Sequence, residues 1–103
     1  MMNVLESDIK SQIKDYLDYT GWTHFPLSES MYGTKGVPDR VAIKNGVIIW
    51  LEIKRNGNKQ SKGQIEFQEM MEDAGGNYCL AYSVEDLDDY IYELTGEKNL
   101  LFS

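Results

Sequence analysis

An Asn-Gly pair between two β-rich runs is the feature that most constrains how this sequence can fold. Asn45-Gly46 separates residues 39–44 from residues 47–54, and both flanking runs are rich in β-branched residues. Asn-Gly is the strongest short signal for a two-residue hairpin turn, because both turn positions require a positive φ angle. The sequence therefore predicts an antiparallel hairpin over residues 39–54.

The predicted register of this hairpin brings two acids together. With a two-residue turn Lys44 lies opposite Val47, and continuing the ladder places Asp39 directly opposite Glu52. Opposed Cβ atoms lie about 4.5–5.5 Å apart, so two carboxylates in these positions repel each other. A bound cation or a shared proton makes such a pair tolerable, and Mg²⁺ or Mn²⁺ suits a site of oxygen ligands.

Glu52 is also unusual within its own strand. It is the one polar residue in the run 47–53, which predicts that both faces of the strand are covered. A buried carboxylate costs roughly several kcal/mol unless it is paired or binds a metal. Lys54 follows two residues later and shares the face of Glu52. The alternative is a salt-bridged strand end in which Lys54 only neutralises an acid.

The remaining elements predict an α/β fold with a mixed sheet between helices. Apolar spacing, caps and glycines predict helices over residues 4–19, 61–74 and 84–94, strands over 23–27, 39–44, 47–54 and 77–82, and a loop over 28–36. The order is α-β-β-β-α-β-α, and the length of 103 residues suits a single domain, residues 1–103.

Charge and composition leave a nucleic-acid partner possible. The net charge of −7 argues at first against binding to phosphates. However, Arg55, Lys59 and Lys62 follow Lys54 with no acid among them, which predicts a DNA-contacting stretch, the alternative being a solvated loop. A single cysteine, no secretion signal and no apolar run of about 20 residues lead us to expect a cytoplasmic protein without a membrane segment.

The ordered motifs resemble a known nuclease family. Pro38-Asp39 followed by Glu52-Ile53-Lys54 resembles the PD-(D/E)xK signature. The wider set adds Glu6 in the first helix, Gly36-Val37 before the signature and Gln64 at the start of the next helix. This set is similar to the VRR-NUC family, the virus-type replication–repair nucleases, over nearly the whole chain. The resemblance implies a restriction-endonuclease-like three-layer core.

The resemblance also implies a metal site. Asp39 and Glu52 would hold a Mg²⁺ or Mn²⁺ ion together with the main-chain carbonyl of Ile53. Glu6 would reach the metal directly or through water, and its place on the apolar stripe of its helix directs it inward. The alternative is that the negative charge of Glu6 only interacts favourably with the positive, N-terminal end of the helix dipole.

Two further side chains receive roles from the resemblance. Lys54 would position or activate the attacking water and stabilise charge on the phosphate. Gln64 would orient Lys54 or the water, although it is also the fourth residue of a capping box opened by Ser61 and could serve there alone. Lys35 and Tyr32, in the glycine-containing loop, are candidates for contact with the phosphate backbone.

The expected function is a metal-dependent DNA endonuclease. Stand-alone relatives of this kind resemble Holliday-junction resolvases, which implies branched or flapped DNA as substrate, a homodimer, and a phage-infected or bacterial cell as setting. One alternative is a non-catalytic binding protein that keeps the nuclease fold, which the acidic residues 85–97 would suit. Another is a restriction-type endonuclease subunit. His24, Trp22, Trp50, Phe67 and Cys79 are interpreted as structural.

Overall fold

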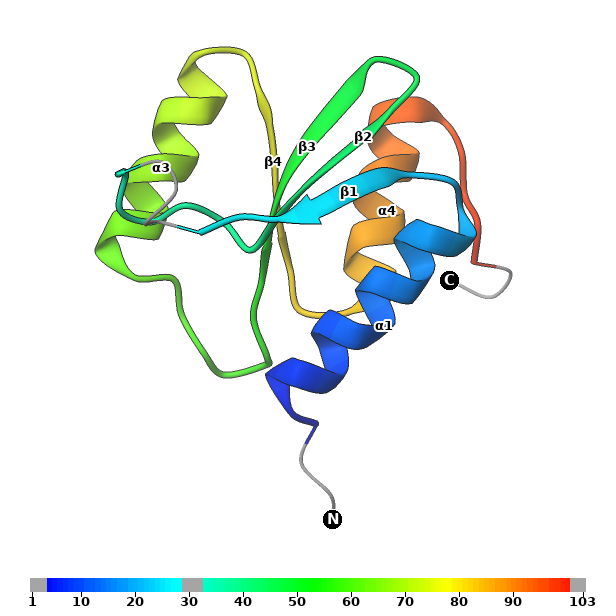
Figure 1. The fold of residues 1–103 in the computed structure, drawn as a ribbon, viewed down its shortest axis with the longest axis horizontal. Helices are drawn as coiled ribbons and strands as arrows, with labels where there is room; N and C mark the ends of the chain where they lie inside the picture. Colours follow the sequence, from blue (N-terminus) through cyan, green and yellow to red (C-terminus); the bar gives the residue numbers. More distant parts are fainter. Residues whose placement is uncertain (1–3, 29–32, 101–103) are drawn as a thin grey trace.

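The computed structural model describes residues 4–28 and 33–100 (Figure 1). The elements follow the predicted order α-β-β-β-α-β-α. Their bounds are α1 Glu6–Tyr19, β1 Thr23–Pro26, β2 Arg40–Lys44, β3 Val47–Ile53, α3 Lys62–Asp73, β4 Asn77–Ala81 and α4 Val84–Thr95.

The four strands form one mixed sheet in the order β1-β2-β3-β4. The first two pairings are antiparallel and β3 pairs with β4 in parallel. The hairpin has the predicted register, since Lys44 lies opposite Val47 and Arg40 opposite Leu51. The turn has positive φ angles of 51° at Asn45 and 80° at Gly46, as a two-residue turn with the twist of the strands requires.

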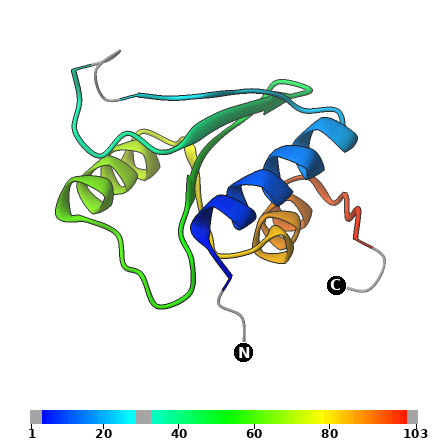
Figure 2. The same cartoon turned by 60° about the horizontal axis from the view of Figure 1, so that its bottom comes forward.

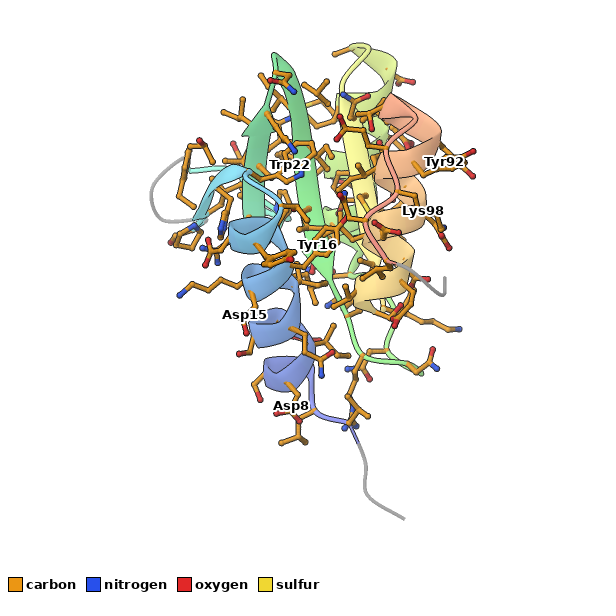
Figure 3. All side chains as sticks on the ribbon, turned by 90° about the vertical axis from the view of Figure 1, so that its right-hand side faces the viewer. Asp8, Asp15, Tyr16, Trp22, Tyr92 and Lys98 are labelled. Atoms are coloured by element: carbon orange, nitrogen blue, oxygen red, sulfur yellow. The ribbon has the colours of Figure 1, made fainter. Side chains whose placement is uncertain are left out.

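Helices cover both faces of the sheet and make three layers. In Figure 2, α1 and α4 lie on one side of the sheet and α3 on the other. The main core lies under α1 and α4 and joins Ile13 and Leu17 of α1, Ile49 and Leu51 of β3, and Leu87 of α4. Figure 3 shows Tyr16 and Trp22 near this layer, while Asp8 and Asp15 project from the outer side of α1.

Side-chain direction in β3 separates the apolar core from the polar site. Ile49, Leu51 and Ile53 are at most 1% exposed and belong to the core under α1 and α4. Trp50 and Glu52 alternate with them and therefore face the α3 side. Coverage of that side is uneven, which corrects the expectation that both faces of β3 are fully covered. Near the turn Ile48 is 44% exposed, because α3 spans only part of the strand.

The uncovered part of the α3 side is an apolar hollow of about 400 Å³. Its lining comes from β1, β2, β3, α3 and the segment before β2: Phe25, Leu27, Thr34, Val37, Val41, Ile43, Ile48, Trp50, Phe67, Met70 and Met71. Trp50, which the sequence assigned to the core, is therefore only partly buried.

Two glycines bring the segment before β2 against the start of α3. Gly36 has a φ angle of 77°, and a Cβ at this position would lie 2.0 Å from the carbonyl oxygen of Gly63. No side chain fits in that space, so the backbones of the two segments touch. The contact fixes the segment that leads to Asp39 against the helix that carries Gln64.

The strands are slightly shorter than predicted. The sequence placed Asp39 and Lys54 inside the hairpin strands, but β2 begins at Arg40 and β3 ends at Ile53. The backbone carbonyl of Asp39 accepts a 2.9 Å hydrogen bond from the N–H of Leu27, and its side chain bonds to the backbone of β3. Both residues therefore lie at strand ends.

Tyr32, a candidate for contact with the phosphate backbone, lies outside the described residues.

Within residues 4–28 and 33–100, no helix combines the length and apolar character needed to cross a membrane.

Candidate active site

The centre of the candidate site is the carboxyl group of Glu52, at the end of β3. Glu52 is only 3% exposed. Burial, together with the charge of Asp39 and a side-chain hydrogen bond to it, raises the pKa of Glu52 to about 8, against the opposing charges of Lys54 and Lys10. The two acids predicted to face each other are thus within hydrogen-bonding reach. A shared proton or a bound cation would relieve the repulsion between them.

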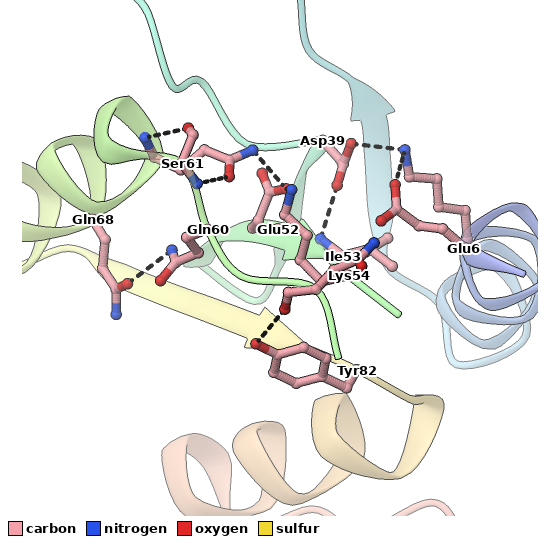
Figure 4. A network of polar contacts seen from close by, with 12 residues as sticks. Glu6, Asp39, Glu52, Ile53, Lys54, Gln60, Ser61, Gln68 and Tyr82 are labelled. Atoms are coloured by element: carbon pink, nitrogen blue, oxygen red, sulfur yellow. Dashed lines mark hydrogen bonds and ion pairs between the residues drawn. The ribbon is translucent and has the colours of Figure 1, made fainter. Parts of the chain in front are cut away.

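Asp39 uses both carboxylate oxygens in contacts with other elements. Its Oδ2 accepts a 2.8 Å hydrogen bond from the backbone N–H of Ile53, which holds the side chain against the end of β3. Its Oδ1 lies 3.1 Å from Nζ of Lys10, on α1. Figure 4 shows Asp39 between these two contacts, with Glu52 beside it.

Lys54 and Gln64 both contact the same oxygen of Glu52. The ammonium of Lys54 lies 3.9 Å from Oε2 of Glu52, and the Lys54 side chain is 18% exposed. The amide of Gln64 donates a 3.0 Å hydrogen bond to the same Oε2. The resemblance implied that Gln64 would orient Lys54 or water. In the structure, the Gln64 amide contacts the carboxylate beside Lys54.

Gln64 also completes the capping box at the start of α3, so its two proposed roles coexist. Its Oε1 accepts a 2.8 Å hydrogen bond from the N–H of Ser61, and Oγ of Ser61 accepts one of 3.2 Å from the N–H of Gln64. The capping bond uses the amide oxygen and leaves the amide nitrogen directed at Glu52. The cap thereby fixes the orientation of the amide.

Lys10 is a site residue that the sequence analysis missed. Its Nζ lies 3.3 Å from Oε2 of Glu6, in addition to its contact with Asp39. Partial burial lowers the pKa of Lys10, but hydrogen bonds and charges from Asp39 and Glu6 outweigh this and raise it overall. Glu6 is therefore connected to Asp39 through Lys10. A signal existed in the sequence, because Lys10 lies one helical turn after Glu6 on the same side of α1.

The donor set fits a hard divalent cation in part. Asp39 and Glu52 offer adjacent carboxylates whose mutual repulsion a cation would relieve. Among the described residues, however, no three Asp, Glu, His or Cys side chains lie close enough together to hold a metal. Two carboxylates are thus in place, and main-chain or water oxygens would have to complete the coordination.

The wall beside Glu52 is aromatic. The rings of Trp50 and Phe67 meet edge to face at 5.8 Å, and Phe67 lies 6.3 Å from the ring of Tyr78. Phe67 and Tyr78 are buried. The cluster lies close to Glu52, since the charge of Glu52 raises the pKa of Tyr78 in addition to the effect of burial.

Hydrogen bonds tie the loop between β3 and α3 to β4, to α3 and to the residue after β4; Figure 4 shows those to Gln68 of α3 and to Tyr82 after β4. The amide of Gln60 donates to Gln68 on α3 and to the hydroxyl of Tyr78, at 3.1 and 3.2 Å. The hydroxyl of Tyr82 donates a 3.3 Å bond to the carbonyl of Asn58. These bonds hold the second half of the loop that leaves Lys54.

The four basic residues proposed to contact DNA lie on the surface around this site. Lys35, Arg55, Lys59 and Lys62 are all exposed. Lys35 and Lys62 line one hollow beside the start of α3, which follows from the contact between the neighbouring Gly36 and Gly63. Lys62 also lies 4.0 Å from Glu66, on the next turn of the helix.

His24 and Cys79 were interpreted as structural residues, and their surroundings agree with this. His24 accepts a 2.8 Å hydrogen bond from Nε of Arg40 at Nδ1, and its other ring nitrogen contacts Asp18. Cys79 is 3% exposed in the core. Neither residue reaches the acid pair.

The three-layer fold, with paired acids and a lysine at the end of the central hairpin, defines a nuclease fold of the restriction-endonuclease type. No family model matches the sequence, and no curated protein matches it significantly. Among solved structures, the chain is similar to a "VRR_NUC domain" with a TM-score of 0.74 and 25% identity, covering 84% of this chain and 92% of that one. A "VRR_NUC domain protein" has the same fold, with a TM-score of 0.72 and 14% identity over 96% and 94% of the two chains.

The first of these similarities supports an assignment to the VRR-NUC family, in agreement with the motif resemblance, and the second supports the fold.

Proposed function

We propose that this chain is a divalent-metal-dependent nuclease that hydrolyses phosphodiester bonds in DNA. The observation that carries the proposal is the carboxyl of Glu52, 3% exposed and held against Asp39. Two adjacent acids, one of them buried, contribute no stability by themselves. Together with the nuclease fold, the pair favours a catalytic role.

Asp39 and Glu52 would hold a Mg²⁺ or Mn²⁺ ion, with the main-chain carbonyl of Ile53 as a further ligand. When bound, such an ion polarises a phosphoryl oxygen and lowers the pKa of a coordinated water. The hydrogen bond from the N–H of Ile53 keeps Asp39 in place for this task. The hydrogen bond that the amide of Gln64 donates to Oε2 of Glu52 likewise keeps Glu52 in place.

Lys54 is the group that would act on the substrate. Its ammonium lies 3.9 Å from Glu52, at the partly exposed edge of the site. In that position it can bind the scissile phosphate, orient the attacking water and stabilise the charge that develops on the phosphoryl oxygens. Lys35, Arg55, Lys59 and Lys62 would contact the DNA backbone on either side.

The direct test is a cleavage assay on linear duplex, single strand, flap and four-way junction DNA, each with Mg²⁺, Mn²⁺ or EDTA. Cleavage should require the ion and should be abolished in Glu52→Gln and Lys54→Ala. Glu69→Gln, an exposed acid of α3, is the matched control and should cut at the wild-type rate. Wild-type cleavage by a pure Asp39→Ala protein would overturn the assignment of this site.

We further propose that the substrate is branched or flapped DNA and that the chain acts as a homodimer, in the manner of a junction resolvase. A domain of this size has little surface for reading base sequence, so recognition of DNA shape is favoured. Symmetric cutting of two strands needs two active sites. Sedimentation with and without junction DNA tests the dimer. A monomer throughout would remove the resolvase version but would leave a flap-cutting activity open.

Two competing functions make different predictions. Exposed acids along α4, including Glu85, Asp89 and Glu93, would suit a non-catalytic binding protein, which would bind no Mn²⁺ at Asp39 and Glu52. A restriction-type subunit would instead cut plasmid DNA at a fixed set of sequences.

A further inference from the structure

Lys10 connects α1, which carries Glu6, to the segment before β2, which carries Asp39. It lies on the second turn of α1, and its ammonium is 3.3 Å from Glu6 on the same helix and 3.1 Å from Asp39, just before β2. A lysine that served only to stabilise α1 would need the first of these contacts alone. The second contact reaches across to the acid pair.

The oxygen that Lys10 contacts is one that an ion at Asp39 would need. Oδ2 of Asp39 is held by the backbone N–H of Ile53, which leaves Oδ1 as the less constrained oxygen. Oδ1 is the atom next to the ammonium of Lys10. A divalent cation and an ammonium on the same oxygen repel each other strongly in a partly buried site. The two cations are therefore expected to exclude each other.

We propose that Lys10 is a tethered counter-ion of the acid site, which neutralises Asp39 in the metal-free protein and leaves it when a divalent ion binds. The inference rests on the proposed function, because it assumes that the ion binds at Asp39. The Lys10 side chain is 43% exposed, so its ammonium can move into water without displacing α1. Because Lys10 links Glu6 to Asp39, this link between the two acids is lost at the same time.

The test is calorimetric titration of the full chain with MnCl₂. Lys10→Met keeps the length and apolar stem of the side chain and removes the charge. It should bind Mn²⁺ at least about tenfold more tightly than the wild type, because no competing cation must be displaced. Lys10→Arg keeps the charge and should bind close to the wild-type affinity.

The matched control is Lys14→Met. Lys14 is exposed, lies one turn further along α1 and forms no ion pair among the described residues. Its variant should bind Mn²⁺ like the wild type. Equal or weaker binding by Lys10→Met overturns the inference, provided that thermal unfolding shows the variant to be folded.

A second measurement follows the ammonium at position 10 in the wild-type sequence and needs the conservative Lys10→Arg variant only for assignment. Reductive ¹³C-methylation keeps the charge of lysines and gives each an NMR signal, with that of Lys10 assigned through Lys10→Arg. Addition of Mg²⁺ should move the Lys10 signal to the position of exposed lysines and leave Lys14 unchanged. An unmoved Lys10 signal under saturating Mg²⁺ contradicts the inference.

The outcomes separate this inference from the proposed function. If wild type and Lys10→Met bind Mn²⁺ equally, only the counter-ion role fails and the metal site stands. If neither binds Mn²⁺, the metal-dependent function fails and the role of Lys10 fails with it.

Discussion

The hydroxyl of Tyr16 on α1 donates a 2.6 Å hydrogen bond to Oδ1 of Asp88 on α4, a carboxylate with no exposed surface. The backbone N–H of Asn99 donates to the same oxygen at 3.0 Å. Burial alone raises the pKa of Asp88, but the bonds from Tyr16 and Asn99 outweigh it and lower the pKa below its usual range. These contacts connect α1, α4 and the segment after α4.

Tyr16→Phe should therefore lower the free energy of unfolding by about 1.5–3 kcal/mol at pH 7, as expected for a hydrogen bond to a charged group. Because the pKa of Asp88 is lower in the folded protein, its ionised form adds stability above about pH 4, and this is lost as the pH falls through the folded pKa. Urea unfolding at pH 7, 5 and 3 measures the difference between variant and wild type, which should shrink at the lowest pH.

Tyr19→Phe is the control for this measurement, since Tyr19 lies on the same helix and is 91% exposed. It should leave the unfolding curve unchanged at every pH. A Tyr16→Phe effect that stays constant from pH 7 to pH 3 would contradict the role given to Asp88.

Gly36→Ala should destabilise the protein and displace Asp39. The added Cβ would lie 2.0 Å from the carbonyl oxygen of Gly63, and the φ angle of 77° is itself strained for alanine. Gly57→Ala separates the two effects, because Gly57 has a φ angle of 90° with open space around it. We expect a loss of about 1–2 kcal/mol for Gly57→Ala and a clearly larger one for Gly36→Ala, measured by chemical unfolding. Equal losses would mean that the backbone contact is not tight.

Glu52→Gln should stabilise the metal-free protein while it abolishes DNA cleavage. The substitution keeps the shape of the side chain and removes a carboxyl group that ionises readily in the unfolded chain but is held in an environment that disfavours its ionised form, as its raised pKa shows. Replacing a functional group held in an unfavourable setting commonly raises stability by about 0.5–2 kcal/mol. Thermal unfolding in EDTA measures the gain. A marked loss of stability would indicate that Glu52 is a structural residue.

Cys79 should be inert to thiol reagents in the folded protein. It is 3% exposed, and burial raises the pKa of its thiol to about 12, so almost no thiolate is present at neutral pH. Labelling with a chromogenic disulfide should proceed only at the rate of global unfolding and should accelerate in urea in step with the loss of helical signal. Fast labelling without denaturant would show that β4 opens locally.

The hairpin and its facing acids could be predicted because local chemistry determines them. The positive φ angles needed at Asn45 and Gly46 fix the turn, the turn fixes the register, and the register fixes which side chains share a face. The same holds for Gln64, whose position in a capping box follows from Ser61. The strand ends were less predictable. The β2–β3 ladder ends at Arg40, and Asp39 contacts β3 through its side chain, which accepts a hydrogen bond from the N–H of Ile53.

Lys10 and Asp88 were missed because their partners come from elements distant in the sequence. The spacing of Lys10 from Glu6 predicts an ordinary helix pair, and the reach to Asp39 depends on how α1 lies on the sheet. Asp88 follows Leu87 within an acidic run, yet helical periodicity places it on the apolar side together with Ile91. That position was a usable signal, because an acid there must find a buried donor.

The separation between the turn and the acids makes strand register a determinant of activity. Five residue pairs, from Lys44–Val47 to Arg40–Leu51, lie between the two ends of the hairpin. A slip of one residue along β3 would turn the carboxyl of Glu52 toward the apolar core and set a hydrophobic side chain beside Asp39. Substitutions near the turn that leave a folded, soluble protein could thus still inactivate it, although they lie at the far end of the strand from any reacting atom.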